Sequence, residues 1–215
     1  MARNVVVKAI VGIVALGVLG VLFVRSARST RAEAYEVTRD RLSRWTLAVE
    51  PPRGPSGAVL VLRSDEELAR ELFNQVFLRS GESMRGPSPA AMPLVLQDEF
   101  DAAISGTLTP DVLLEIAKAS GLETPSFASQ CMAYRRVSQP GSTRQIYFVR
   151  YEWPAFAAFR TKVAERLATA GGRSVFQPAA LTPLLIVAAS DAAFGSWLPL
   201  QRGETNDCLA PVVVR

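Results

Sequence analysis

The stretch CMAYRRVSQPGSTRQIYFVRYEW, residues 131–153, decides the fold of this chain. Two runs rich in aromatic and β-branched side chains lie on either side of Pro140-Gly141, a pair of residues typical of a tight turn. We therefore predict a β-hairpin from about Gln130 to Trp153. The helix that Pro154 should start is expected to cover one face of the sheet, because four apolar residues share one stripe: Phe156, Phe159, Val163 and Leu167.

The chain on both sides of the hairpin predicts a mixture of short helices and strands. Ser64 and Glu67 form a capping-box pattern that should start a helix ending near Arg79, and Thr109 should cap another helix ending at Gly121. The other predicted elements are strands at 58–63, 183–189 and 210–215, a helix at 97–104 and a loop at 81–93. No regular βαβ repeat is present, so the fold class is α+β, with one soluble domain over 58–215.

The N-terminal segment predicts a single membrane-spanning helix. No charged or strongly polar side chain interrupts residues 9–24, and adding Val5 to Val7 extends the helix to about 30 Å, the thickness of the hydrocarbon layer. A cleaved signal peptide is the alternative, since Ala32-Glu33-Ala34 resembles a cleavage site. We favour an uncleaved anchor over residues 1–24, because the apolar run is longer than that of most signal peptides and arginines follow it.

Residues 25–57 should connect this anchor to the domain. We expect the helix to continue, rich in basic residues, to about Trp45, and a hinge of prolines and glycines at 50–57. Three arginines recur every third residue and are predicted to contact anionic lipid phosphates: Arg25, Arg28 and Arg31.

The orientation of the anchor is left open by its flanking charges. The arginines that follow the anchor favour a cytoplasmic domain. An N-terminal anchor more often exports the domain behind it, and the even number of cysteines suits an oxidising compartment. We favour an extracytoplasmic, periplasmic domain in a bacterial envelope. Cys131 and Cys208 are then either a disulfide or two buried thiols, with the disulfide favoured in an exported domain.

The sequence contains no histidine, which removes many kinds of catalytic site. Without imidazole there is no Ser-His-Asp or Cys-His nucleophile, no His-ligated zinc and no histidine ligand to haem from this chain. No CxxC pair, P-loop or dinucleotide-binding motif is present either. We therefore expect no cofactor. Arginines alternate with aromatic residues over 144–153, but a half-buried strand accounts for this alternation, and no nucleic-acid partner is expected.

A few acidic residues are candidates for a metal site or a catalytic site. Asp98, Glu99 and Asp101 cluster as a hard cation would require, but they also lie where acidic groups stabilise the first turn of a helix. Glu152 lies between Tyr151 and Trp153, which is a position for a buried catalytic acid, but a strand end with aromatic neighbours is usually explained by packing. We favour the structural interpretation for both.

The remaining signal lies in the anchor, where Ala9, Gly12 and Gly20 share one narrow arc that would let another helix approach closely. Together with the missing catalytic motifs, this arc predicts a non-catalytic accessory or scaffold subunit that docks on other subunits of a larger membrane complex. The alternatives are a membrane-tethered hydrolase that uses carboxylates or hydroxyls, with Glu152, Asp98 or Asp191 converging in a cleft, and a module that binds a lipid or solute.

Overall fold

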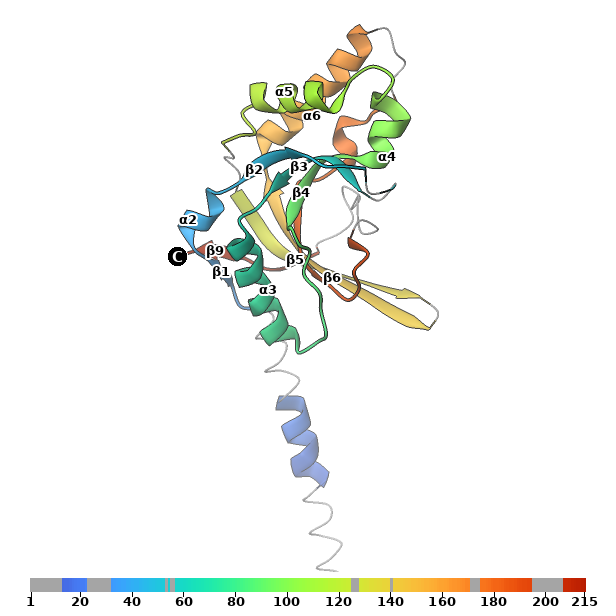
Figure 1. Ribbon diagram of the computed structural model, residues 1–215. Coiled ribbons are helices and arrows are strands. Elements are labelled where there is room, and N and C mark those ends of the chain that lie inside the picture. Colours follow the sequence, from blue (N-terminus) through green and yellow to red (C-terminus); the bar gives the residue numbers. More distant parts are fainter. Residues whose placement is uncertain are drawn as a thin grey trace, which may run out of the picture. The chain divides into compact units, whose positions relative to one another are not determined.

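The computed structural model describes residues 13–22, 32–52, 54, 57–124, 128–139, 141–170, 175–194 and 207–215. The chain divides into two compact units, Met1–Glu33 and Ala34–Arg215. In the first unit, residues 13–22 are helical. Within the described part of the chain, no helix has both the length and the apolar character that crossing a membrane requires. The second unit is an α+β domain, as predicted (Figure 1).

The predicted hairpin is confirmed as strands β5 (Ala128–Gln139) and β6 (Ser142–Glu152). It forms the centre of a four-stranded antiparallel sheet with the order β7-β6-β5-β8, in which β7 is Leu184–Ala189 and β8 is Cys208–Ala210. Successive side chains along each strand point to opposite faces of this sheet. One face packs into the main core through Met132, Tyr147 and Val149, and the other packs into a smaller cluster around Ile146 and Phe148.

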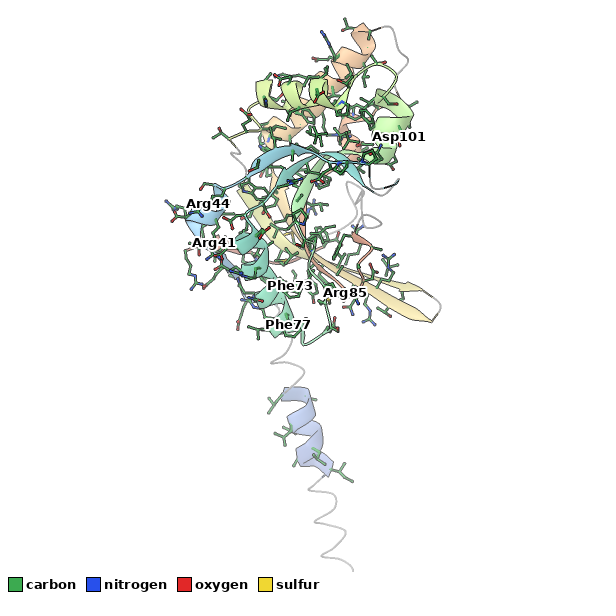
Figure 2. All side chains as sticks on the ribbon, in the orientation of Figure 1. Arg41, Arg44, Phe73, Phe77, Arg85 and Asp101 are labelled. Carbon is green, nitrogen blue, oxygen red and sulfur yellow. A yellow bond between two sulfur atoms is a disulfide. The ribbon has the colours of Figure 1, made fainter. Side chains whose placement is uncertain are left out.

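A second antiparallel sheet has the order β2-β3-β4, with β2 at Thr46–Val49, β3 at Ala58–Arg63 and β4 at Ala91–Leu96. Strand β3 was predicted, whereas β4 was missed because its first three residues were assigned to the loop at 81–93. Pro93 lies within β4 opposite Val61, and the four residues from Pro93 to Leu96 are buried. Burial between neighbouring elements therefore outweighs the proline signal here. Figure 2 shows side chains filling the space between the sheets and the helices.

The domain begins earlier than the sequence predicts. Strand β1 (Tyr35–Val37) pairs in parallel with β9 (Val212–Val214), and the short helix α2 (Arg39–Leu42) follows it. The expected helix to Trp45 and the domain boundary at Ala58 are therefore wrong. The physical reason is that Tyr35 and Val37 are fully buried in the core, which a solvated stalk would not allow.

The segment predicted as a hinge, residues 50–57, instead connects β2 to β3. Glu50 donates its backbone N–H to Val59 O at 2.9 Å, and Glu50 Oε1 accepts from Arg63 Nε at 2.9 Å. Prolines and glycines terminate strands as readily as helices, and only the pairing of β2 with β3 distinguishes a hairpin connection from a hinge.

The helices lie close to their predicted positions. They are α3 (Glu66–Ser80), α4 (Gln97–Glu99) with a π-helical turn at Phe100–Ile104, α5 (Pro110–Ala119), α6 (Pro154–Thr169) and a 3-10 turn at Pro178–Ala180. Thr109 caps α5 as predicted, accepting from Val112 N. The cap of α3 differs, because Asp65 accepts from Glu67 N at 2.7 Å while Ser64 Oγ donates to Ala90 O. In Figure 1, α5 and α6 lie together at one end of the domain, and α3 lies at the other end beside β1 and β9.

Candidate functional site

The outer part of the β5–β6 hairpin extends beyond the neighbouring strands. Among the described residues, β8 is in register with β5 at Met132 and Ala133, and β7 is in register with β6 from Ile146 to Arg150. One backbone hydrogen bond continues beyond each register, from Tyr134 N to Asp207 O and from Ser190 N to Gln145 O. Residues 135–139 and 141–144, which we call the hairpin arm, pair only with each other among the described strands. Figure 1 shows this arm projecting from the body of the domain. Among the residues that the structure describes, no further strand pairs with either edge of this arm.

Two ion pairs fix the base of the hairpin arm to the segments beside it. Arg135 Nη2 lies 2.6 Å from Asp207 Oδ2, next to β8, and Arg144 Nε lies 2.6 Å from Asp191 Oδ2, just after β7. The hydrogen bond to Asp191 raises the pKa of the Arg144 guanidinium above its ordinary value. The side chains of all four residues are between 17% and 32% exposed, so solvent screens these pairs only in part. The arm is braced on both edges.

The exposed surface of the hairpin arm is short and mixed in character. Arg136, Val137, Ser138 and Thr143 are exposed, and Val137 lies opposite Arg144 in the register. Because Arg135 and Arg144 are each paired with an aspartate, Arg136 supplies the positive charge that faces solvent. Val137 is therefore an exposed apolar residue beside polar groups and one cation.

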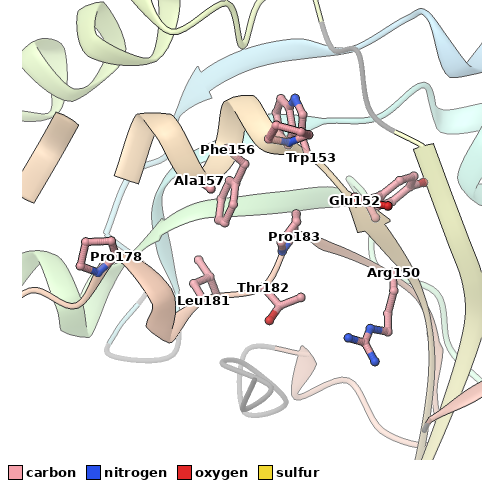
Figure 3. A pocket seen from close by; sticks show the side chains of 11 residues that line it. Arg150, Glu152, Trp153, Phe156, Ala157, Pro178, Leu181, Thr182 and Pro183 are labelled. Carbon is pink, nitrogen blue, oxygen red and sulfur yellow. The ribbon is translucent and has the colours of Figure 1, made fainter. Parts of the chain in front are cut away.

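A pocket of about 320 Å³ opens where β6 meets α6. Figure 3 shows Glu152, Arg150 and Thr182 among its polar lining, with Phe156, Leu181 and several prolines as the apolar part. This volume lies at the lower end of the range typical of small-molecule sites. Glu152 is exposed, whereas its neighbour Tyr151 is fully buried, and this burial raises the pKa of the Tyr151 phenol above its ordinary value.

The carboxylates considered for hydrolysis do not converge in this pocket. Of Glu152, Asp98 and Asp191, only Glu152 is among its described lining residues. Asp191 instead contacts Arg144, and Asp98 Oδ1 accepts from Glu99 N at 2.8 Å in the first turn of α4. A hydrolase that activates water usually needs a second acid or base within reach of the first. The described lining offers one carboxylate and one accessible hydroxyl.

The acidic cluster at 98–101 has structural partners. Asp101 Oδ1 accepts from Gln97 Nε2 at 2.9 Å, and Glu99 Oε2 accepts from Leu96 N at 3.1 Å. In the described parts of the chain, no group of three or more acidic or cysteine side chains is placed to hold a metal ion. These carboxylates stabilise the α4 turn, as the structural interpretation of the sequence proposed.

Sequence reasoning missed the residue that organises this region, Arg160. Its side chain is completely buried, and its Nη2 lies 2.6 Å from Glu99 Oε1. The remaining donors reach Glu99 Oε2, Leu94 O, Gln177 O and Pro178 O at 2.7–3.2 Å. Arg160 lies four residues after Phe156 on the apolar side of α6, and an arginine within an apolar stripe is the sequence signal that points to it. It joins α6 to α4, to β4 and to the start of the 3-10 turn.

Cys131 and Cys208 are joined by a disulfide, one of the two alternatives that the sequence left open. Their Cα atoms are 5.6 Å apart, and the bond connects β5 to β8 across 77 residues of sequence. It holds β8, and with it Asp207, beside the base of the hairpin arm. The disulfide therefore supports the same edge that the Arg135 ion pair braces.

The residues predicted for the anchor are described only in part. Gly20 lies in the helical segment 13–22, is exposed, and has no heavy atom within 4 Å of the position that a Cβ would occupy. The other predicted residues of this region lie outside the described residues: Ala9, Gly12, Arg25, Arg28 and Arg31.

Comparisons of this chain with protein-family models, with curated proteins and with solved structures found no match.

Proposed function

We propose that this protein is a non-catalytic accessory or scaffold subunit. An N-terminal helix over residues 1–24 would tether it to a membrane, and its α+β domain would dock on a larger membrane protein complex, either energy-transducing or part of envelope assembly. The observation that carries the proposal is the hairpin arm, which projects from the domain and is braced on both edges.

The hairpin arm is better explained as a binding surface than as an element that stabilises the domain. A two-stranded hairpin is marginally stable in water, and its open edges invite further strands, so proteins usually keep such edges short or covered. Here Arg135 and Arg144 instead hold an extended ribbon in place. A partner that adds a strand to such an edge gains backbone hydrogen bonds, and little conformational entropy is lost because the ribbon is already ordered.

The predicted anchor supports the membrane part of this proposal, and the disulfide supports an extracytoplasmic domain. A disulfide between Cys131 and Cys208 is stable in an oxidising compartment, whereas cytosolic thiols are kept reduced. Other membrane-protein subunits would therefore contact the arm outside the cytoplasm, and the arc of Ala9, Gly12 and Gly20 would offer a second contact within the bilayer.

A solute- or lipid-binding module or a tethered hydrolase is the second candidate, favoured by the pocket beside Glu152. Its lining combines apolar side chains with Arg150, Glu152 and Thr182, which could orient a small polar ligand. The separation of Glu152 from Asp98 and Asp191 makes binding the better use of this pocket.

Site-specific photo-crosslinking tests the docking proposal. A photoreactive amino acid replaces Val137 on the hairpin arm or, as a matched control, Val112 on α5, since both valines are 36% exposed. The full-length protein is expressed in its own membranes, illuminated, extracted in mild detergent and separated on a native gel. We expect cross-links to defined subunits from Val137 only, within a band of several hundred kilodaltons.

Two results would count against the scaffold proposal. Migration of the protein on its own would show that it has no host complex. Equal cross-linking from Val137 and Val112 would show that the arm is not the docking surface. If the complex persists without arm cross-links, Gly12→Leu and Gly20→Leu test the anchor arc instead, because leucine would block close helix approach.

A further inference from the structure

The second half of α3 exposes apolar side chains on one stripe of the helix. Phe77 is 48% exposed and Leu78 is 79% exposed, although both lie in regular helix. With Arg70, Asn74 and Gly81 they make up the exposed stripe that faces away from the core. Phe77 and Leu78 therefore form a small exposed apolar patch near the end of the helix.

The exposed ring of Phe77 is held in place rather than left to rotate freely. It stacks on Phe73 with ring centroids 6.3 Å apart and an interplanar angle of 15°. Phe73 in turn contacts the loop after α3, where a Cβ added to Gly86 would lie 3.3 Å from the Phe73 ring. Figure 2 shows Phe73 and Phe77 on α3, with Arg85 of that loop nearby. We call Phe77 and Leu78, supported by Phe73, the α3 apolar tip.

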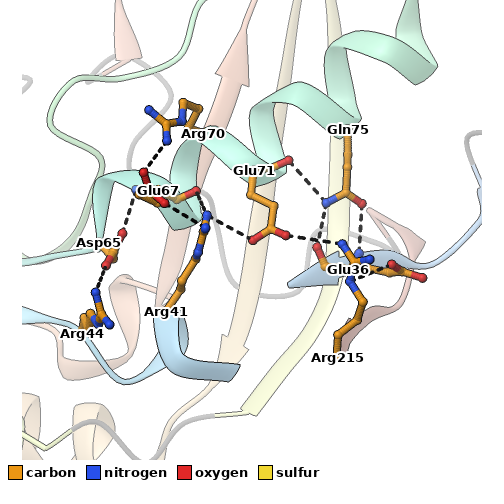
Figure 4. Close-up of polar contacts among 9 residues, drawn as sticks. All are labelled: Glu36, Arg41, Arg44, Asp65, Glu67, Arg70, Glu71, Gln75 and Arg215. Atoms are coloured by element: carbon orange, nitrogen blue, oxygen red, sulfur yellow. Dashed lines mark hydrogen bonds and ion pairs between the residues drawn. The ribbon is translucent and has the colours of Figure 1, made fainter. Parts of the chain in front are cut away.

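The chain enters the folded domain beside this tip. Arg79, the residue after Leu78, donates from Nη2 to Ala34 O at 2.9 Å, and its guanidinium lies 4.2 Å from the ring centroid of Tyr35. One turn earlier, the Gln75 amide accepts from Glu36 N at 3.0 Å and donates to Glu36 O at 2.7 Å, as Figure 4 shows. The first residues of the domain are therefore fixed along the last turns of α3.

A short connection between the predicted anchor and Ala34 limits how far the α3 apolar tip can lie from a membrane that holds the anchor. If the spanning helix ends at Val24, nine residues, Arg25 to Glu33, separate it from Ala34. Nine residues reach at most about 32 Å when fully extended and about 14 Å as a helix. Arg25, Arg28 and Arg31 lie in this connection and are predicted from the sequence to contact anionic phosphates.

We propose that the α3 apolar tip binds the surface of the anionic bilayer that carries the anchor, with Phe77 and Leu78 inserted at the boundary between headgroups and acyl chains. This inference rests on the membrane tether of the proposed function. Exposed aromatic and leucine side chains are typical of the apolar face of a helix that lies on a bilayer. The tether keeps the tip at a high effective concentration near lipid, so a small apolar area is sufficient.

The contact would also orient the domain. The tip lies at the α3 end of the domain, and α5 and α6 lie at the other end (Figure 1). A domain fixed to the bilayer by its tether and by the tip has little freedom to tumble, and it presents the hairpin arm to neighbouring subunits at a constant angle. Binding of the arm to a partner then loses less rotational freedom.

Depth-dependent fluorescence quenching tests the proposal. The full-length protein carrying Leu78→Trp or, as the control, Val112→Trp is reconstituted into vesicles of phosphatidylcholine and phosphatidylglycerol in equal parts. Some of the lipids carry a doxyl group that quenches nearby tryptophan. The quenching of the unsubstituted protein is subtracted. We expect the tryptophan at 78 to be quenched at least threefold more than that at 112, and Phe77→Asp to abolish this difference.

Three outcomes would overturn the proposal. Equal quenching at the two positions in protein that resists extraction by alkaline carbonate would show a tip away from lipid, while leaving the tether intact. A blue-shifted but unquenched tryptophan at 78 would assign the tip to a protein partner or a second copy of the chain. Release of the protein by carbonate would refute the tether, and with it both proposals.

Discussion

Replacing Glu99 with glutamine should destabilise the domain by about 3 kcal/mol, because a fully buried guanidinium would lose its counter-charge. Arg160 is completely buried and Glu99 is 17% exposed, so water can replace little of the lost interaction. Breaking a buried pair by removing one partner usually costs about 3–5 kcal/mol. Glutamine keeps one oxygen that can accept from Arg160 or from Leu96 N, which places the expected loss at the lower end.

The measurement is urea denaturation of the full-length protein in mild detergent, followed by tryptophan fluorescence. Trp45 and Trp153 are both buried and report the loss of the core. The control is Glu115→Gln, which removes an exposed pair with Lys118 and should change the free energy of unfolding by less than about 0.5 kcal/mol.

A double-mutant cycle then isolates the Arg160–Glu99 interaction. Arg160→Met also removes the bonds to Leu94 O, Gln177 O and Pro178 O, so alone it should cost about 4 kcal/mol. The double variant should be less destabilised than the sum of the two single variants by about 2 kcal/mol. A loss below about 0.5 kcal/mol for Glu99→Gln, or additive losses, would refute the reasoning that this pair joins α6 to α4.

Three further predictions concern other parts of the domain. Burial raises the pKa of Tyr151, so the native state keeps a proton that the unfolded state loses above about pH 10, and the free energy of unfolding should fall there by about 1.4 kcal/mol per pH unit. Denaturation measured from about pH 9 to about pH 11 should show a shallower fall for Tyr151→Phe than for the unsubstituted protein. The same slope for both proteins would contradict this prediction. Reduction of the Cys131–Cys208 disulfide, which closes 77 residues, should lower the free energy of unfolding by up to about 4 kcal/mol, measured by denaturation with and without reductant. Gln75→Leu should cost about 2 kcal/mol by removing both hydrogen bonds to the Glu36 backbone, with faster amide exchange at 35–37; unchanged exchange would argue against this role for the amide.

The sequence predicted the candidate sites only in part. The sequence located the hairpin, in which Gln139 and Ser142 are the last pair of residues before the loop. It did not indicate that β7 and β8 stop short of the hairpin tip, since strand length and pairing partner are set by distant segments. The arm, the ion pairs that brace it and the α3 apolar tip all depend on such distant neighbours.

The sequence by itself determined the elements whose signals are local. Turn residues, caps and apolar periodicity act over a few positions, so the hairpin, α5, α6 and strands β3 and β7 lie where the sequence predicts them. Only the tertiary structure decided that Tyr35–Val37 is a strand paired with β9, that Pro93 lies inside β4, and that Arg160 is buried against Glu99. In each of these cases burial among segments far apart in the chain outweighs local preference, because the apolar area and buried hydrogen bonds gained exceed the propensity lost.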